Sequence, residues 1–229
     1  TDQAPFDKDA FNDACSKNYG DQCIFFLNAY WAEYSADAEK IWTAWKKFIE
    51  LDGKESGYAL DSFNLNRLLE ALGQTMTAIQ FREEFGKLDQ NFDKKMGTLE
   101  YLVYRYKVQI KELLSRPQGT DEKLEEATRA LQKVQDEIEK IETEKANLEK
   151  LADGEGFKAT KAKNELAQLL SRDQLPLNKA LIEAKLAVKK ASQGGLLSAQ
   201  GKLWWMNKQV EEASKYKPKS NLKKSDKWR

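Results

Sequence analysis

The stretch DQNFDKKMGTLE (residues 89–100) decides the fold, because it has the spacing of a twelve-residue calcium loop. Calcium prefers oxygen ligands, and such a loop supplies them from positions 1, 3, 5, 7, 9 and 12. The corresponding protein ligands are Asp89, Asn91, Asp93, Lys95 through its carbonyl, and Glu100 as the bidentate closing residue. Gly97 stands at the ninth position and would act through a water molecule. Because helical patterns flank the loop, the sequence predicts an EF-hand with one Ca²⁺ site.

The sixth loop position carries Lys94, where such loops nearly always have glycine. That position has a positive φ, which a residue with a Cβ atom adopts at a cost of about 1–2 kcal/mol. We therefore predict calcium binding that is weakened about tenfold and not abolished. The alternative is an EF-hand fold kept as a scaffold around a loop that binds no ion.

A partner loop is expected upstream, since EF-hands occur in pairs. In ELDGKESGYALDSFN (residues 50–64), Leu60 lies 36 residues before Met96, the usual offset between the paired residues of two such loops. Aligning Leu60 with the eighth position puts Asn64 last, and the loop then lacks a closing carboxylate. We predict a partner loop that binds no calcium.

Helical periodicity dominates the whole chain, which has few glycines and prolines, and predicts an all-α fold. In the N-terminal half, helices are expected over residues 22–51, 61–73, 77–88 and 98–116. In the C-terminal half, residues 120–152 have apolar residues at alternating spacings of three and four, with one lysine among them. These seam positions are Leu124, Ala127, Leu131, Val134, Ile138, Ile141, Lys145 and Leu148.

Two shorter helices are expected over about residues 158–171 and 176–192. Their combined length matches that of the long helical segment over residues 120–152. An antiparallel helical hairpin or coiled-coil bundle is the expected fold, and an intermolecular coiled coil is the alternative. Residues 193–201 are expected to be a flexible connection, followed by a last helix over residues 202–216 that Trp204, Trp205 and Met206 anchor.

The composition changes near SRPQGTDE (residues 115–122), where proline and glycine interrupt the helical pattern. We expect an EF-hand pair domain with an N-terminal helical extension over residues 1–118, and the helical bundle over residues 119–214. The last segment, residues 215–229, has seven basic residues and one aspartate and reads as a basic tail.

Several classes of function are disfavoured by the composition. The net charge is +1, so no overall field points to nucleic acid or a membrane surface. The chain contains no histidine and no glycine-rich phosphate loop, which weighs against an enzyme. Its two cysteines are too few for a disulfide framework, and no leader pattern is visible, so a cytoplasmic location is expected.

Four stretches resemble the calcium-regulated actin-bundling proteins of amoebae and related protists. They are FLNAYWAEYS (26–35), LDQNFDKKMGTLEYLVYRYK (88–107), IEKIETEKANLEKLA (138–152) and LWWMNKQVEE (203–212). The resemblance implies cross-linking of F-actin that calcium inhibits, at the actin cytoskeleton, by a monomer or weak dimer. Lys94 departs from the family pattern, which has glycine there. The alternative function is an EF-hand sensor or buffer that docks a non-actin partner through its coiled-coil arm.

Overall fold

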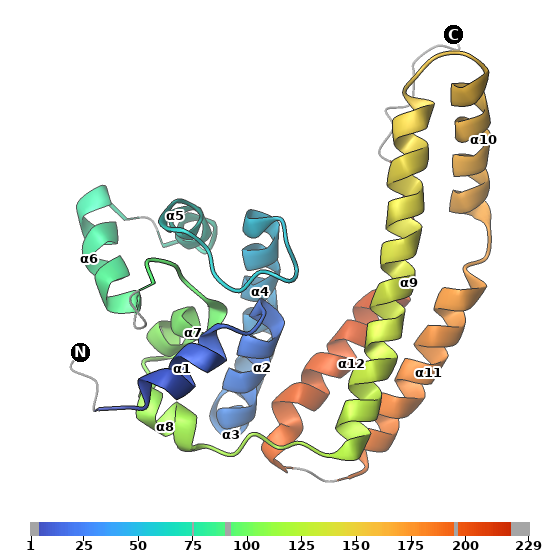
Figure 1. Cartoon of the computed structure of the whole chain (residues 1–229). Coiled ribbons are helices and arrows are strands. Elements are labelled where there is room, and N and C mark those ends of the chain that lie inside the picture. The colour runs from blue at the N-terminus through green and yellow to red at the C-terminus, as the bar shows by residue number, and fades with distance from the viewer. Residues whose placement is uncertain (1–4, 75, 90–92, 195–196, 221–229) are drawn as a thin grey trace. The chain divides into compact units, whose positions relative to one another are not determined.

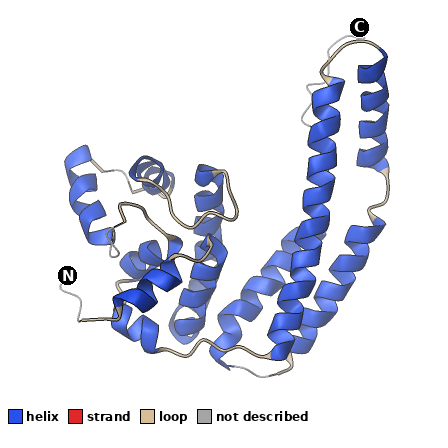
Figure 2. Cartoon of the chain, viewed as in Figure 1, coloured by secondary structure: helices blue, strands red, loops and turns tan. Residues whose placement is uncertain are grey.

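The computed structural model describes residues 5–74, 76–89, 93–194 and 197–220, and every regular element within these ranges is a helix (Figure 2). This confirms the all-α fold class. Two compact units are present: Thr1–Gly119 with Leu196–Lys202, and Thr120–Gly195 with Leu203–Arg229. Within the described part of the chain, no helix is both long and apolar enough to cross a bilayer.

The first unit is built from short helices, some of which begin with a capping side chain. Its elements are α1 (Lys8–Cys15), α2 (Tyr19–Ala29), α3 (Trp31–Tyr34), η1 (Ser35–Asp37), α4 (Ala38–Asp52), α5 (Ser62–Ala71), α6 (Ala78–Leu88), α7 (Thr98–Tyr106) and α8 (Ile110–Ser115). The side chains of Asp7, Asn18 and Asp61 accept backbone N–H bonds at the starts of α1, α2 and α5. These caps satisfy donors that a helix leaves without an internal partner.

The single helix expected over residues 22–51 is wrong, because the chain leaves helical geometry twice. Tyr30 has φ −124° and ψ 29°, and Tyr34 has φ −124° and ψ 17°. Both rings join an aromatic cluster, in which Tyr30 lies 5.3 Å from Phe26 and Tyr34 lies 4.5 Å from Tyr106, between ring centroids. Packing of these aromatic side chains overrides the local helical propensity.

The helix expected over residues 98–116 is also divided. Lys107 adopts φ 53° and ends α7 in the left-handed conformation, and α8 starts three residues later. The Val108 N–H bonds back to the Val103 carbonyl, and the Val108 and Ile110 side chains are both buried. The turn therefore directs both apolar side chains inward. A continuous helix would place them differently.

Helix α2 is central to the first unit, where it packs against α4 and α7 (Figure 1). Phe48 of α4 is fully buried, and its ring centroid lies 5.4 Å from that of Tyr19 and 5.8 Å from that of Tyr101. These three rings connect α2, α4 and α7. The helix that leaves the predicted calcium loop is thus part of the core of the unit.

The second unit is organised around one long helix. Its elements are α9 (Glu122–Ala152), α10 (Phe157–Ser171), α11 (Leu175–Ser192) and most of α12 (Gln200–Ser214), and both α10 and α11 pack along α9 (Figure 1). Seven of the eight predicted seam residues of α9 are buried, and Ile138 is half-buried. Lys145 is buried among them and donates a hydrogen bond to Glu142, which also accepts one from the Tyr216 hydroxyl.

The connection before α12 is more regular than a flexible linker. Residues Leu197–Ala199 form the turn η2, and α12 starts at Gln200. A Cβ atom on Gly201 would lie 2.6 Å from the Asn28 nitrogen, so glycine permits the close approach of α12 to α2 within the first unit. Trp205 and Met206 are buried and Trp204 is half-buried, as expected for anchoring residues.

Candidate metal centre

One antiparallel bridge, between Leu60 and Met96, joins two loops of the first unit. Leu60 belongs to the predicted partner loop within residues 50–64, hereafter the first loop, and Met96 belongs to the predicted calcium loop. The Leu60 N–H donates to the Met96 carbonyl at 2.9 Å, and the Met96 N–H donates to the Leu60 carbonyl at 2.8 Å. Both side chains are buried. This is the pairing that the spacing of 36 residues predicts.

The Asp89 carboxylate binds two backbone N–H groups of the predicted calcium loop. Its Oδ1 accepts from the Asp93 N–H and its Oδ2 from the Lys94 N–H, each at 3.0 Å. Asp93 Oδ1 in turn accepts from the Lys95 N–H at 2.7 Å. Lys94 has φ 63°, so a lysine makes the left-handed turn that glycine usually makes. These bonds tie the Asp89 carboxylate to the backbone of Asp93 and Lys94, and the Asp93 carboxylate to the backbone of Lys95.

The second half of the loop leads into α7. Gly97 is the residue before the helix, and its N–H donates to Oε2 of Glu100 at 3.0 Å. Glu100 is 1% exposed. The Lys95 ammonium points to the first loop, where it donates to the Tyr58 hydroxyl at 2.8 Å; this bond raises the pKa of Lys95. The Lys95 side chain is thus held by Tyr58, and only its backbone carbonyl is a candidate ligand.

The structure places four of the five predicted ligands, namely Asp89, Asp93, Lys95 and Glu100, and Asn91 lies outside the described residues. Within the described ranges, no three His, Cys, Asp or Glu side chains are grouped closely enough to hold a metal ion. The donor set nevertheless consists of the oxygen ligands that Ca²⁺ prefers, and the backbone turn at Lys94 is formed. The ligand chemistry suits calcium, while the described carboxylates lie too far apart to coordinate one ion in this structure.

The helix that enters the loop is held to the helix that leaves it. The Tyr104 hydroxyl of α7 donates to Glu84 of α6 at 2.6 Å, and this bond raises the pKa of Tyr104 to about 12. A second hydrogen bond, from Lys87 at 2.7 Å, holds the same carboxylate. A movement of α7 near the loop would therefore also displace α6.

Sequence reasoning missed Gln22, a fully buried residue of α2. Its side-chain oxygen accepts from the Leu99 N–H at 2.9 Å and from the Thr98 hydroxyl at 3.2 Å. Its amide nitrogen lies 2.8 Å from the Tyr58 carbonyl in the first loop. Gln22 thus bonds to both loops. No spacing rule of calcium loops includes a residue this far upstream, so the sequence carried no signal for it.

The Cys15 thiol lies near the same loop and is buried. Burial raises its pKa, and the negative charges of Glu100 and Asp93 raise it further. A thiol of this kind stays protonated at neutral pH and is unreactive. Cys15 therefore has the environment of an ordinary core residue, and Cys23 is buried as well.

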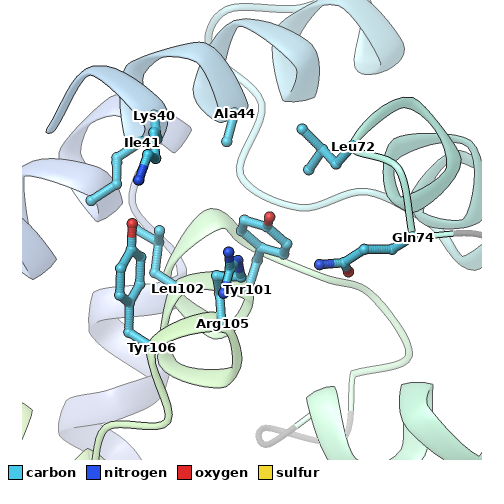
Figure 3. Close-up of a pocket in the computed structure, with 9 residues that line it drawn as sticks. All are labelled: Lys40, Ile41, Ala44, Leu72, Gln74, Tyr101, Leu102, Arg105 and Tyr106. Atoms are coloured by element: carbon cyan, nitrogen blue, oxygen red, sulfur yellow. The ribbon is translucent and has the colours of Figure 1, made fainter. Parts of the chain in front are cut away.

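A small pocket of about 160 Å³ lies between α4, α7 and the turn after α5 (Figure 3). Lys40 and Arg105 contribute its charged groups, and Ile41, Leu72 and Leu102 contribute apolar walls. Pockets for cofactors and drug-sized ligands have roughly 300–1,000 Å³. We assign this pocket no ligand.

Comparison with known proteins now adds to this geometry. The family described as "F actin bundling C terminal" matches residues 95–224, which start inside the predicted calcium loop and include all of α9 to α12. The chain belongs to this family. It is 31% identical to the calcium-regulated actin-bundling protein of Dictyostelium discoideum. The alignment has a length of 249 residues and covers 86% of this chain and 84% of that protein.

A solved structure agrees with this relationship. The crystal structure of the 34 kDa F-actin bundling protein from Dictyostelium discoideum matches with a TM-score of 0.82 and 31% identity, over 93% of this chain and 97% of that one. The names of these relatives describe a filament-bundling protein and no enzyme, which confirms the expectation that this family member is not an enzyme. The resemblance identified from four short stretches is confirmed over most of the chain.

Proposed function

We propose that this protein binds and cross-links actin filaments at the cytoskeleton, and that calcium bound at one EF-hand inhibits this activity. The observation that carries the proposal is the relatedness to a calcium-regulated actin-bundling protein over 86% of the chain. We infer an EF-hand pair domain over residues 1–118, an antiparallel helical hairpin over residues 119–214 and a basic tail over residues 215–229. Cross-linking requires two filament sites on one chain or a weak dimer.

Asp89, Asn91, Asp93, the Lys95 carbonyl and Glu100 would hold the ion. When bound, calcium would supply a positive charge that draws these oxygens together. Glu100 is on the first turn of α7, so its movement toward the loop would shift that helix. Since α7 contacts α2 and α6, the shift would spread through the first unit.

The surface that we assign to the filament lies on α10 and α11. Residues 157–192 contain eight basic and three acidic residues, a net charge of +5, whereas residues 122–152 contain six basic and nine acidic residues, net −3. On α11, exposed apolar and basic side chains share one face at helical spacing, namely Leu175, Lys179, Ile182, Leu186 and Lys189. A face that combines basic and apolar side chains is complementary to the acidic surface of actin.

Co-sedimentation with actin filaments tests the proposed function. We expect pelleting of bundles at low speed in the presence of a calcium chelator and less pelleting when calcium is added. Pelleting that is equal in calcium and chelator would contradict the calcium regulation. Absence of the protein from the filament pellet under all conditions would contradict actin binding and favour a sensor that docks another protein.

A double substitution on α11 tests the filament-binding face. Ile182 and Leu186 are 60% and 56% exposed, so Ile182→Ser with Leu186→Ser removes apolar surface without opening the core. If each side chain contributes about 1 kcal/mol on burial against actin, affinity for filaments falls roughly tenfold or more. Phe63→Ser is a matched control, because Phe63 is a 70% exposed apolar residue of α5 in the first unit, outside the assigned surface. Equal loss of filament binding in both variants would contradict the assignment.

Substitution of the strained loop lysine tests the calcium site. Lys94→Gly removes the Cβ atom from a residue with φ 63°, and we expect calcium binding to become about fivefold to tenfold tighter in calorimetry. Lys107→Gly is the matched control, because Lys107 has φ 53° at the far end of α7. It should raise the stability of the protein and leave calcium affinity unchanged. Calorimetric titrations that show no binding for the parent and for Lys94→Gly would reject the site.

A further inference from the structure

The first turn of α7 needs hydrogen-bond acceptors from outside the helix. The first N–H groups of any helix have no partner within it, and the residue before α7 is Gly97, which has no side chain to cap them. One bond comes from Glu100, whose Oε2 accepts from the Gly97 N–H. Glu100 is also the closing ligand in the proposed calcium site, so its oxygens would serve both purposes.

Gln22 provides the other acceptor, and it does so from a different helix. Its Oε1 lies 2.9 Å from the Leu99 nitrogen and 3.2 Å from the Thr98 hydroxyl. The orientation of the amide is fixed, because its Nε2 lies within 2.6–2.8 Å of three carbonyl oxygens that can only accept. Those carbonyls belong to Cys15, Lys17 and Tyr58. The side chain is fully buried, so water cannot substitute for it.

Gly97 is required by the same contact. A Cβ atom at this position would lie 2.5 Å from Oε1 of Gln22 and 3.2 Å from the Tyr58 carbonyl. A capping serine or aspartate could therefore not replace the glycine while Gln22 keeps its position. In this protein the side chain that caps α7 belongs to α2 and not to the ninth residue of the loop.

We propose that Gln22 is the positioning residue of the calcium loop: it caps α7 from α2 and thereby leaves the Glu100 carboxylate available to the ion. The proposal rests on the proposed calcium site. A loop that depended on Glu100 alone would lose its helix cap whenever this carboxylate turned to calcium. With Gln22 in place, the Leu99 N–H keeps its partner in both situations. The Tyr58 and Cys15 carbonyls hold the Gln22 amide in the orientation that this bond requires.

The test compares two buried amides of α2 in the full chain. Gln22→Met removes the cap at nearly constant volume, and calorimetry should show calcium affinity reduced about fivefold, the factor that corresponds to one helix cap. Asn28→Leu is the control, since Asn28 is buried in the same helix and its Oδ1 accepts from the Lys202 N–H of α12 at 2.8 Å. It should lower stability but leave calcium affinity at the parent value. An unchanged affinity in Gln22→Met, or an equal loss in both variants, would overturn the proposal.

Amide hydrogen exchange of the parent protein is a second test, and it requires no substitution. On addition of calcium, the Gly97 amide should exchange faster as Glu100 leaves it, while the Leu99 amide stays protected. Loss of protection at both amides would show that Gln22 does not hold α7 independently. A parent chain that takes up no calcium would reject the calcium site and this inference together, whereas normal uptake with unprotected Leu99 would reject the inference alone.

Discussion

Glu100→Gln is expected to weaken calcium binding at least about a hundredfold and to leave filament bundling insensitive to calcium. A bidentate closing ligand needs two oxygens, and glutamine offers one oxygen and no charge. Removing one charged partner from a buried site costs about 2–5 kcal/mol, and about 2.7 kcal/mol corresponds to a factor of one hundred. The remaining amide oxygen can still accept from the Gly97 N–H, so α7 keeps this cap and the protein stays folded. Calorimetry and co-sedimentation measure the two effects.

The control for this variant is Glu55→Gln in the first loop. Glu55 lies between Asp52 and Leu60, in a loop whose frame provides no closing carboxylate. We therefore expect the calcium affinity and the number of bound ions to remain those of the parent. If Glu55→Gln removes calcium binding as Glu100→Gln does, the first loop takes part in the site, and the prediction of a non-binding partner loop is wrong.

The sequence specifies a candidate calcium loop because the constraints on such a loop are local. Fixed positions in a twelve-residue segment specify ligand chemistry, and a single offset specifies the Leu60–Met96 pairing that the structure contains. The amide of Gln22 obeys no such rule. Its partners Tyr58 and Leu99 are 36 and 77 residues away along the chain, and only tertiary packing brings them together.

The same contrast applies to the helices. Residues 122–152 form one helix as predicted, since one apolar seam continues through them and the partner helices bury it. The chain near Tyr30 and Tyr34 has an equally helical pattern, yet the helix breaks there. Both rings pack against Phe26, and Tyr34 also packs against Tyr106. Periodicity cannot distinguish an aromatic residue on a continuous helical face from one that packs after a break.

Phe48→Ala is expected to lower the free energy of unfolding of the first unit by about 3–5 kcal/mol, the usual cost of truncating a buried phenylalanine. Phe48 is fully buried, and its ring contacts Tyr19 of α2 and Tyr101 of α7. The resulting cavity would therefore loosen the helix that carries Glu100, and calcium binding should weaken as well. Hydrogen exchange measured by mass spectrometry reports each unit separately: peptides from α4 and α7 should exchange faster, and peptides from α9 should not.

Phe63→Ala is the matched control, because Phe63 is 70% exposed on α5 and leaves little cavity when truncated. Its ring lies 5.9 Å from the Arg67 guanidinium, a contact worth about 0.5–1 kcal/mol at an exposed site, so the loss of stability should stay below about 1 kcal/mol. Faster exchange in α9 of Phe48→Ala would mean that the two units unfold as one. Calcium would then act on the stability of the helices that we propose to bind filaments, since an ion bound in the first unit would stabilise both units against unfolding.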